Sequence, residues 1–283
     1  MADKRPTAEI DCGKALTLIG AGNTAEIFDY CEGVILKLFR KNMPRGAIEH
    51  EYDNAAKIHA CFPDTPDVLG MVRLKERYGI LYEKISGTDV LSLALRRPWK
   101  LRRYGCLLAK LHSRMHAVST DIQYSVKRKL TDDISHGEGL TDGEKRQVLR
   151  ILDGLPDGNS LCHFDFHIGN IMYDGTKYSV IDWMCACSGD PAADIARTML
   201  LMTTGEPMHM SVVRRAYIRL CMKSMRNAYL RSYCAQSGVT RSDIERWTIP
   251  VAAARLSEWL TDSEHTVIIR MVRKGLSTEA RQG

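Results

Sequence analysis

A single run of polar side chains constrains this chain more than any other feature. Residues 163–170 read His-Phe-Asp-Phe-His-Ile-Gly-Asn, and a short hydrophobic stretch, the turn signal Asp174-Gly175 and a second hydrophobic stretch then lead to Asp182. This pattern predicts a β-hairpin, which brings its two ends together. The amide oxygen of Asn170 and the carboxylate of Asp182 are the kinds of ligand that Mg²⁺ prefers. Asp165 is left on the preceding loop, where it is free to accept a proton from a substrate hydroxyl, so the pattern is typical of magnesium-assisted phosphoryl transfer.

Composition places the chain among ordinary globular proteins. Its 283 residues are 45% hydrophobic and 26% charged, enough for one large core or two modest lobes. No apolar run approaches the roughly 20 residues that span a bilayer, and no signal-peptide core follows the first residues. We therefore expect a cytoplasmic location and no membrane partner. The nine cysteines are scattered along the chain and are expected to be reduced, packed as small hydrophobic residues.

The formal net charge is +6. Basic pairs and triples occur at 96–97, 102–103, 127–129 and 214–215, on segments expected to be helical. Such runs are usually solvated helix faces, so neither a nucleic acid nor an obligate protein partner is expected. A modest positive field is also compatible with an anionic nucleotide.

Two regions of different character follow one another along the chain. Strands are expected near 16–20, 25–31, 34–39, 68–76 and 80–84, with one helix over 47–59. Helical periodicity then dominates, from the segment that starts at Pro98 to further helices near 141–153, 191–203, 208–235, 241–260 and 262–275. The predicted fold is α+β and bilobal, with a small antiparallel β-rich lobe over 1–84 and a larger, mainly helical lobe over 85–283.

The small lobe offers groups that can hold phosphate. Gly20, Gly22, Asn23 and Thr24 form a turn between two expected strands, where backbone N–H groups can approach phosphate oxygens. Lys37 lies mid-strand, and its cation needs a carboxylate on the following helix. Glu51 and Glu49 compete for this role. They are about 200° apart around the helix, and Glu51 is favoured because it shares the more apolar face with Ala55 and Ile58.

Together these motifs resemble the aminoglycoside phosphotransferase and choline kinase family, small-molecule kinases that share the protein-kinase fold. The resemblance rests on Gly20-x-Gly22, Lys37, Glu51, the linker 81–85, His163-x-Asp165-x-x-x-x-Asn170 and Ile181-Asp182-Trp183, and it covers about residues 15–260. It implies ATP or GTP bound between the lobes, with the backbone from Glu83 to Ile85 meeting the base and Lys37 paired to Glu51. Asp165 would be the catalytic base, Asn170 and Asp182 would hold Mg²⁺, Asp190 would support the loop, and His163 would brace it.

Departures from the protein-kinase pattern indicate a small acceptor. Phe164 stands where a regulated protein kinase carries an arginine, and too few residues follow Asp182 for an activation loop. Two alternatives to a kinase remain. One is a metal-dependent hydrolase that uses His163, Asp165 and His167, with His112 and His116 completing the site. The other is a catalytically inactive nucleotide-binding protein.

The acceptor is the least constrained feature. The resemblance puts it against the helical lobe, where the candidate substrate-binding residues are His167, Glu245, Trp247, Glu258 and Trp259. Acidic groups beside tryptophans suit an amino sugar or a quaternary amine. We rank the possible acceptors with an unspecified hydroxyl metabolite or antibiotic first, an aminoglycoside second and a choline-like amino alcohol third. An antibiotic acceptor would make the protein a resistance enzyme.

Overall fold

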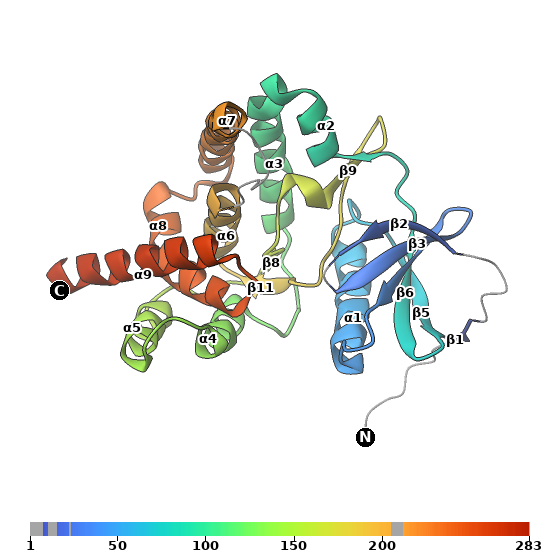
Figure 1. Ribbon diagram of the computed structural model, residues 1–283, viewed down its shortest axis with the longest axis horizontal. Coiled ribbons are helices and arrows are strands. Elements are labelled where there is room, and N and C mark those ends of the chain that lie inside the picture. The colour runs from blue at the N-terminus through green and yellow to red at the C-terminus, as the bar shows by residue number, and fades with distance from the viewer. Residues whose placement is uncertain (1–7, 11–15, 23, 205–211, 283) are drawn as a thin grey trace. The chain divides into compact units, whose positions relative to one another are not determined.

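The computed structural model describes residues 8–10, 16–22, 24–204 and 212–282 (Figure 1). Side chains are described for these residues except 204, 212–219 and 280–282. The chain divides into two compact units. The first comprises Met1–Asp89 with Ile171–Met184, and the second comprises Val90–Asn170 with Cys185–Gly283. An antiparallel-rich sheet fills the first unit and helices dominate the second, so the predicted α+β fold of the protein-kinase type is confirmed.

The first unit is built on a sheet with the strand order β1-β5-β6-β4-β3-β2. Its elements are β1 (Ala8–Glu9), β2 (Thr17–Ala21), β3 (Ala25–Cys31), β4 (Val34–Phe39), α1 (Arg45–Cys61), β5 (Val68–Leu74) and β6 (Arg77–Glu83). All neighbouring strands are antiparallel except β1 and β5, which pair in parallel. Gly33, with φ of 73°, makes the tight turn between β3 and β4 that the Glu32-Gly33 pair predicts.

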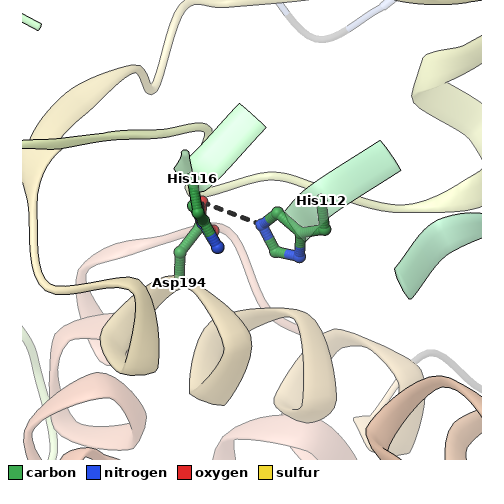
Figure 2. A group of neighbouring side chains, drawn as sticks. All are labelled: His112, His116 and Asp194. Atoms are coloured by element: carbon green, nitrogen blue, oxygen red, sulfur yellow. Dashed lines mark hydrogen bonds and ion pairs between the residues drawn. The ribbon is translucent and has the colours of Figure 1, made fainter. Parts of the chain in front are cut away.

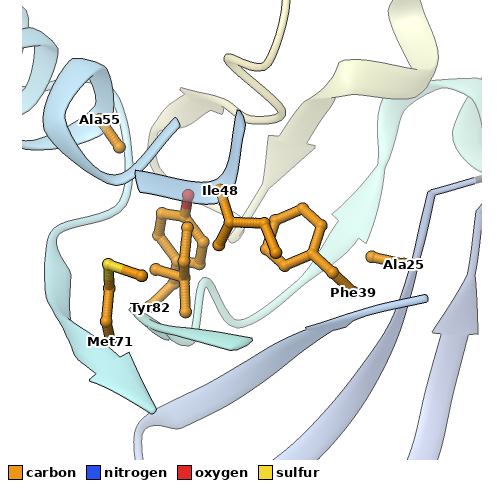
Figure 3. Close-up of a cluster of buried hydrophobic side chains, with 7 residues drawn as sticks. Ala25, Phe39, Ile48, Ala55, Met71 and Tyr82 are labelled. Atoms are coloured by element: carbon orange, nitrogen blue, oxygen red, sulfur yellow. The ribbon is translucent and has the colours of Figure 1, made fainter. Parts of the chain in front are cut away.

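Helix α1 covers one face of this sheet over a hydrophobic core. Figure 3 shows this cluster, in which Ile48 and Ala55 from the helix meet Phe39, Met71 and Tyr82 from the strands. Ala25 and Ile80 complete it. Since Phe39 and Ile80 are fully buried, β4 and β6 are held rigidly under the helix. This packing fixes Lys37, on β4, against Glu51, on α1.

The hairpin expected from the opening motif is present in the first unit. Strands β9 (Ile171–Tyr173) and β10 (Tyr178–Val180) are antiparallel, and their register pairs Ile171 with Val180. Asp174 closes the turn because its Oδ1 accepts hydrogen bonds from the backbone N–H groups of Thr176 and Lys177. Strand β7 (Thr88–Asp89) adds a third strand beside β9.

The second unit consists of helices around a short two-stranded ribbon. Its elements are α2 (Val90–Arg96), η1 (Pro98–Lys100), α3 (Leu101–His116), α4 (Val126–His136), α5 (Asp142–Asp153), β8 (Ser160–Cys162), η2 (Ile168–Asn170), β11 (Cys187–Gly189), α6 (Pro191–Thr204), α7 (Val212–Ser237), α8 (Arg241–Ala254), η3 (Arg255–Ser257) and α9 (Asp262–Gln282). The ribbon pairs β8 with β11. Helix α8 is shorter than the expected 241–260, and helix α4 was not predicted. The part of the expected helix over 208–211 lies outside the described residues.

Helices α3 and α7 lie side by side in the second unit (Figure 1). A Cβ atom at Gly105 would lie 2.3 Å from the backbone oxygen of Met225, so only glycine permits this close approach. Leu108, Leu111 and Met115 form the buried face of α3. No helix in the described part of the chain is long and apolar enough to cross a membrane.

The cysteines are reduced where the structure describes them. None of the eight described cysteines forms a disulfide, whereas Cys12 lies outside the described residues. Cys31, Cys61 and Cys106 are exposed, so the expectation that the cysteines are packed inside is wrong for these three.

Candidate active site

The ammonium group of Lys37 is held between two carboxylates in the first unit. Its Nζ atom donates to Glu51 Oε1 at 2.7 Å and to Asp182 Oδ1 at 2.9 Å. The predicted pairing with Glu51 is therefore confirmed, and Glu49 is instead paired with Arg45, one turn away on α1. The hydroxyl of Tyr82 also donates to Glu51 Oε1, at 3.0 Å. The other oxygen of Glu51, Oε2, is buried without a hydrogen-bond partner among the described residues.

The electrostatics of this group keep Lys37 charged. Burial by itself would lower the pKa of Lys37, but the attraction of Glu51 and Asp182 outweighs it and raises the pKa above its usual value. The lysine side chain is 10% exposed, whereas that of Asp182 is 46% exposed. Asp182 therefore has access to solvent and to a ligand, while the cation behind it is fixed.

Asp182 has a left-handed backbone, with φ of 64°. A non-glycine residue in this region is uncommon, and the conformation persists only where the surroundings hold it. Trp183, the next residue, supplies that support: its ring is buried and its Nε1 donates to Thr65 Oγ1 at 2.6 Å. The strained backbone and the anchored tryptophan together fix the direction of the Asp182 carboxylate.

The glycine turn lies between β2 and β3. Gly22 N donates to Ala25 O at 2.8 Å, and a side-chain N–H of Arg40 donates to Gly22 O at 3.1 Å. Thr24 is half-buried, and its backbone oxygen accepts from Arg40 N. Sequence reasoning missed Arg40, which ties this turn to the end of β4. Asn23 lies outside the described residues, and the phosphate role of the glycines stays a prediction.

The segment from Glu83 to Ile85 begins at the last residue of β6. Glu83 N donates to Asp67 O and Lys84 N donates to Gly33 O, both at 2.9 Å. Neither of these amides is available to a nucleotide base. Of the three amides, only that of Ile85 donates to no described backbone oxygen.

Asp165 and Asn170 lie together in the second unit. The side-chain amide of Asn170 donates to the backbone oxygen of Asp165 at 2.9 Å and to its Oδ2 at 3.2 Å. Because the amide nitrogen faces Asp165, the amide oxygen is left to act as a ligand. His163 is fully buried, and its Nδ1 accepts from Asp165 N at 3.2 Å, which fits the predicted bracing role. His167 Nε2 lies 3.6 Å from Asp165 Oδ2.

The surroundings of Asp165 favour its ionised form. Burial would raise the pKa of its carboxyl group, but His167 first, and then His163 and Arg197, outweigh burial and bring the pKa below its usual range. A carboxylate of such low basicity is a poor base in the ground state. It can orient a hydroxyl and take its proton late, once phosphoryl transfer has made that proton acidic.

The backbone of the Asp165 loop is held from α6 by Asp194, which sequence reasoning missed. Asp194 Oδ2 accepts from His163 N at 2.6 Å and Oδ1 accepts from Phe164 N at 3.0 Å. Arg197 Nε donates to Phe164 O at 3.2 Å. Asp190 was expected to support this loop, but its Oδ1 instead accepts from Ala192 N at the start of α6.

Two histidines of α3 meet the same carboxylate. His112 Nε2 and His116 Nε2 lie 3.1 and 3.2 Å from Asp194 Oδ2, and Figure 2 shows both rings at this carboxylate. The Nδ1 atoms of the two histidines lie 2.6 Å from the hydroxyls of Tyr229 and Tyr233, on α7. A carboxylate only accepts, so His116 Nε2 donates to Asp194 and His116 Nδ1 accepts from Tyr233. His112 Nε2, although it lies close to Asp194, forms no hydrogen bond with any described residue. The five side chains form one buried network beneath the loop.

This network decides against the hydrolase alternative. Among the described residues, only His112, His116 and Asp194 bring three His, Cys, Asp or Glu ligand atoms within 4.8 Å of one another. The group contains none of His163, Asp165 and His167, so the expected alternating metal site is wrong. All three of its members are buried, and the Nδ1 atoms of both histidines already have tyrosine partners.

The candidate substrate residues have different surroundings. Trp247 is 1% exposed and belongs to the core, so its predicted contact with substrate is wrong. Glu258 accepts from Arg197 and also pairs with Arg255, while the neighbouring Trp259 is 96% exposed. Because Arg197 also donates to Phe164 O, Glu258 lies close to the Asp165 loop. Glu245 lines a separate cavity of about 170 Å³ between α6 and α8, and His167 is partly exposed.

The residues present fit a magnesium ion. Asn170 and Asp182 offer an amide oxygen and a partly exposed carboxylate, the hard oxygen ligands that this ion takes. No thiol or imidazole is needed, as it would be for a softer metal.

The fold and these side chains define a phosphotransferase with the protein-kinase architecture. The model of the phosphotransferase enzyme family matches residues 20–241, and the chain belongs to this family. No curated protein matches the sequence.

Solved structures of the same fold are distant in sequence. The aminoglycoside phosphotransferase APH(2″)-IIa, in a ternary complex with streptomycin and ATP, is 14% identical with a TM-score of 0.58, over 92% of this chain and 91% of that one. A choline kinase from Cryptosporidium parvum Iowa II is 12% identical with a TM-score of 0.57, over 95% and 90%. The macrolide 2′-phosphotransferase MphH from Brachybacterium faecium is 16% identical with a TM-score of 0.52, over 91% of each chain.

Proposed function

We propose that this protein is a small-molecule kinase that transfers the γ-phosphoryl group of ATP or GTP to a hydroxyl group. One observation carries the proposal: Lys37 Nζ is held at 2.7 Å by Glu51 and at 2.9 Å by Asp182. A buried, permanently charged ammonium next to a half-exposed carboxylate is an arrangement for binding polyphosphate and its metal ion. A structural ion pair would need no second carboxylate open to solvent.

The first unit would bind the nucleotide. Lys37 would contact its phosphates, and Gly20 and Gly22, together with Asn23 and Thr24, would close over them. The amide of Ile85 would meet the base, as would the carbonyl of Glu83, whose own amide is engaged with Asp67 O. Nothing in these contacts distinguishes adenine from guanine, so both donors are proposed.

Asn170 and Asp182 would hold Mg²⁺, which when bound neutralises the phosphate charge that develops during transfer. Asp165 would orient the acceptor hydroxyl in line and take its proton late, consistent with its lowered pKa. His163 and Asp194 would keep the Asp165 loop in place through the hydrogen bonds described above. Positioning and charge neutralisation supply most of the acceleration in such a reaction.

The acceptor is proposed to be a small hydroxylated metabolite or antibiotic. Aminoglycosides come second and choline-like amino alcohols third, because Glu258 and Trp259 lie near the loop and could meet a cation. His167, beside Asp165, would contact the acceptor, and Glu245 would do so only from its separate cavity. We propose that the enzyme acts in the cytoplasm without a nucleic acid or an obligate protein partner.

The experiment is mass spectrometry of acceptors incubated with the protein and Mg-ATP or Mg-GTP. The panel holds aminoglycosides, macrolides, other hydroxylated antibiotics, choline, ethanolamine, homoserine and common sugars. We expect one compound to gain a single phosphoryl group with the wild type and none with Asp165→Asn. Product formed equally by both proteins would contradict the assignment of Asp165. Failure of the protein to bind either nucleotide would contradict the kinase proposal itself.

A further inference from the structure

The positive charge of the chain is concentrated in one segment. Residues 90–120 contain seven Lys and Arg and no Asp or Glu, although the net charge of the whole chain is only +6. The rest of the chain therefore carries a net charge of −1. This segment forms α2, η1 and α3 of the second unit.

The cations of α3 gather on one face of the helix. Arg102, Arg103, Lys110 and Arg114 are exposed, whereas Leu108, Leu111 and the two histidines on the opposite face are buried, and this buried side packs on α7. At 100° per residue the four cations fall within one third of the helix circumference. Arg96, Arg97 and Lys100 extend the same charge into α2 and η1.

Most of these cations form no ion pair within the described part of the chain. Arg96, Arg97, Lys100, Arg102, Arg103 and Lys110 form no ion pair with any residue that the structure describes. Elsewhere surface cations do find acids, as Lys41 does with Glu76 and Arg273 with Glu144. A run of unpaired, mutually repelling cations is unfavourable in the isolated protein and favours an anionic partner.

Exposed apolar side chains lie within this charged region. Leu95 is 64% exposed, Trp99 is 71% exposed and Leu91 is 43% exposed. Trp99 precedes Arg102 and Arg103 by one helical turn, because η1 runs directly into α3. We name nine of the exposed side chains of 91–114 the basic–apolar surface: Leu91, Leu95, Arg96, Arg97, Trp99, Arg102, Arg103, Lys110 and Arg114.

We propose that the basic–apolar surface docks the protein on an anionic lipid bilayer. A tryptophan and two leucines surrounded by arginines match the interfacial region, where the rings and aliphatic groups enter the headgroup layer and the cations meet lipid phosphates. Exposed leucines favour lipid over nucleic acid, because they cannot stack on bases or bind phosphate. Docking of this kind needs no membrane-spanning segment, so it revises the expectation of no membrane partner.

The test uses tryptophan fluorescence with vesicles of phosphatidylcholine alone and of phosphatidylcholine with about one-third phosphatidylglycerol. The chain has four tryptophans, of which Trp183 and Trp247 are buried and Trp99 and Trp259 are exposed. We expect a blue shift with the anionic vesicles only. The shift should disappear in Trp99→Ala and persist in Trp259→Ala, the matched exposed tryptophan.

Sedimentation with the same vesicles tests the charge. The double variant Arg102→Glu with Arg103→Glu should bind at least about tenfold more weakly, whereas Arg270→Glu with Lys274→Glu, on the exposed face of α9, should bind like the wild type. Binding should weaken steeply with added salt. Melting curves check that each variant is folded.

Three outcomes would overturn the proposal. The first is no binding to anionic vesicles at low salt. The second is equal loss of binding in both charge-reversal variants, which would indicate attraction by net charge alone. The third is tighter binding to single-stranded RNA than to vesicles through the same residues, which would assign the surface to nucleic acid.

Discussion

Phe164 N donates a hydrogen bond to Asp194 Oδ1 at 3.0 Å, and the backbone of Phe164 is left-handed, with φ of 61°. An aromatic residue in that conformation costs roughly 1–2 kcal/mol. The bond to Asp194 compensates for part of this cost and turns the next residue, Asp165, out of the buried loop. The network of His112, His116 and the two tyrosines thus acts on the proposed base through Asp194.

The buried network should make stability depend on pH. Burial, and then the neighbouring His116, lower the pKa of His112 to about 3, from the ordinary 6.5 of the unfolded chain. Between these values the unfolded state binds the extra proton, so the free energy of unfolding falls as pH decreases from about 6.5, by up to about 1.4 kcal/mol per pH unit. Urea unfolding at several pH values should show this slope, with His112→Gln flattening it and the exposed His136→Gln leaving it unchanged. Equal slopes in all three proteins would contradict the neutral buried His112.

Asp165→Asn should lower kcat by about 10²–10⁴, because the amide cannot take the proton of the acceptor hydroxyl. The lowered pKa of Asp165 also predicts the direction in which activity depends on pH. The active carboxylate persists above that pKa, so activity should show no acid loss from Asp165 near neutral pH. His167→Ala removes the main group that lowers this pKa, so the acid limb of kcat/KM should move to higher pH. Superimposable pH profiles of wild type and His167→Ala would count against this coupling.

Asp182→Ala should abolish activity more completely than Lys37→Ala. Loss of a metal ligand removes several kcal/mol of charge stabilisation, about 10³–10⁴ in rate, whereas loss of one cationic contact costs about 10²–10³. Steady-state kinetics of the two variants test the order. Lys41→Ala is the matched control, because Lys41 is an exposed lysine paired to Glu76 just beyond β4. Near-normal turnover in Asp182→Ala would contradict the scheme.

Glu51→Gln should raise the KM for nucleotide, and Glu49→Gln should not. Glu51 is buried and holds Lys37, so a neutral amide leaves the ammonium drawn toward Asp182 alone. Glu49 pairs only with Arg45, at a helix position one turn away, where an ion pair contributes about 0.3–0.5 kcal/mol. Nucleotide titration by calorimetry measures the difference directly. Similar dissociation constants for the two variants would show that Lys37 needs no support from α1.

Substitution of two tryptophans of the second unit should have different effects on the free energy of unfolding. Trp247→Ala removes a buried ring and should lower the free energy of unfolding by about 3–5 kcal/mol. Trp259→Ala changes an almost fully exposed ring and should stay within about 0.5 kcal/mol of the wild type. If Trp259 contacts the acceptor, its variant should raise the KM for that acceptor alone. Unfolding curves and kinetics on one acceptor separate the two effects.

Local sequence patterns predict the short elements and the residue pairs that these elements bring together. The hairpin from Ile171 to Val180 follows from a turn signal between two hydrophobic stretches, and the choice of Glu51 over Glu49 follows from the helical repeat. Both depend on neighbours in sequence, or on one strand packed against the next helix. Spacing therefore suffices to predict them.

The remaining features of the site depend on packing between distant parts of the chain. Asp194 holds the loop in place of Asp190, and its neighbours His112 and His116 come from a helix far away in the sequence. Trp247, on α8, is buried and Trp259, between η3 and α9, is exposed, although the sequence predicts a single helix over 241–260. Burial depends on which faces of distant helices meet, and the summed packing of many side chains sets this, so no local pattern encodes it.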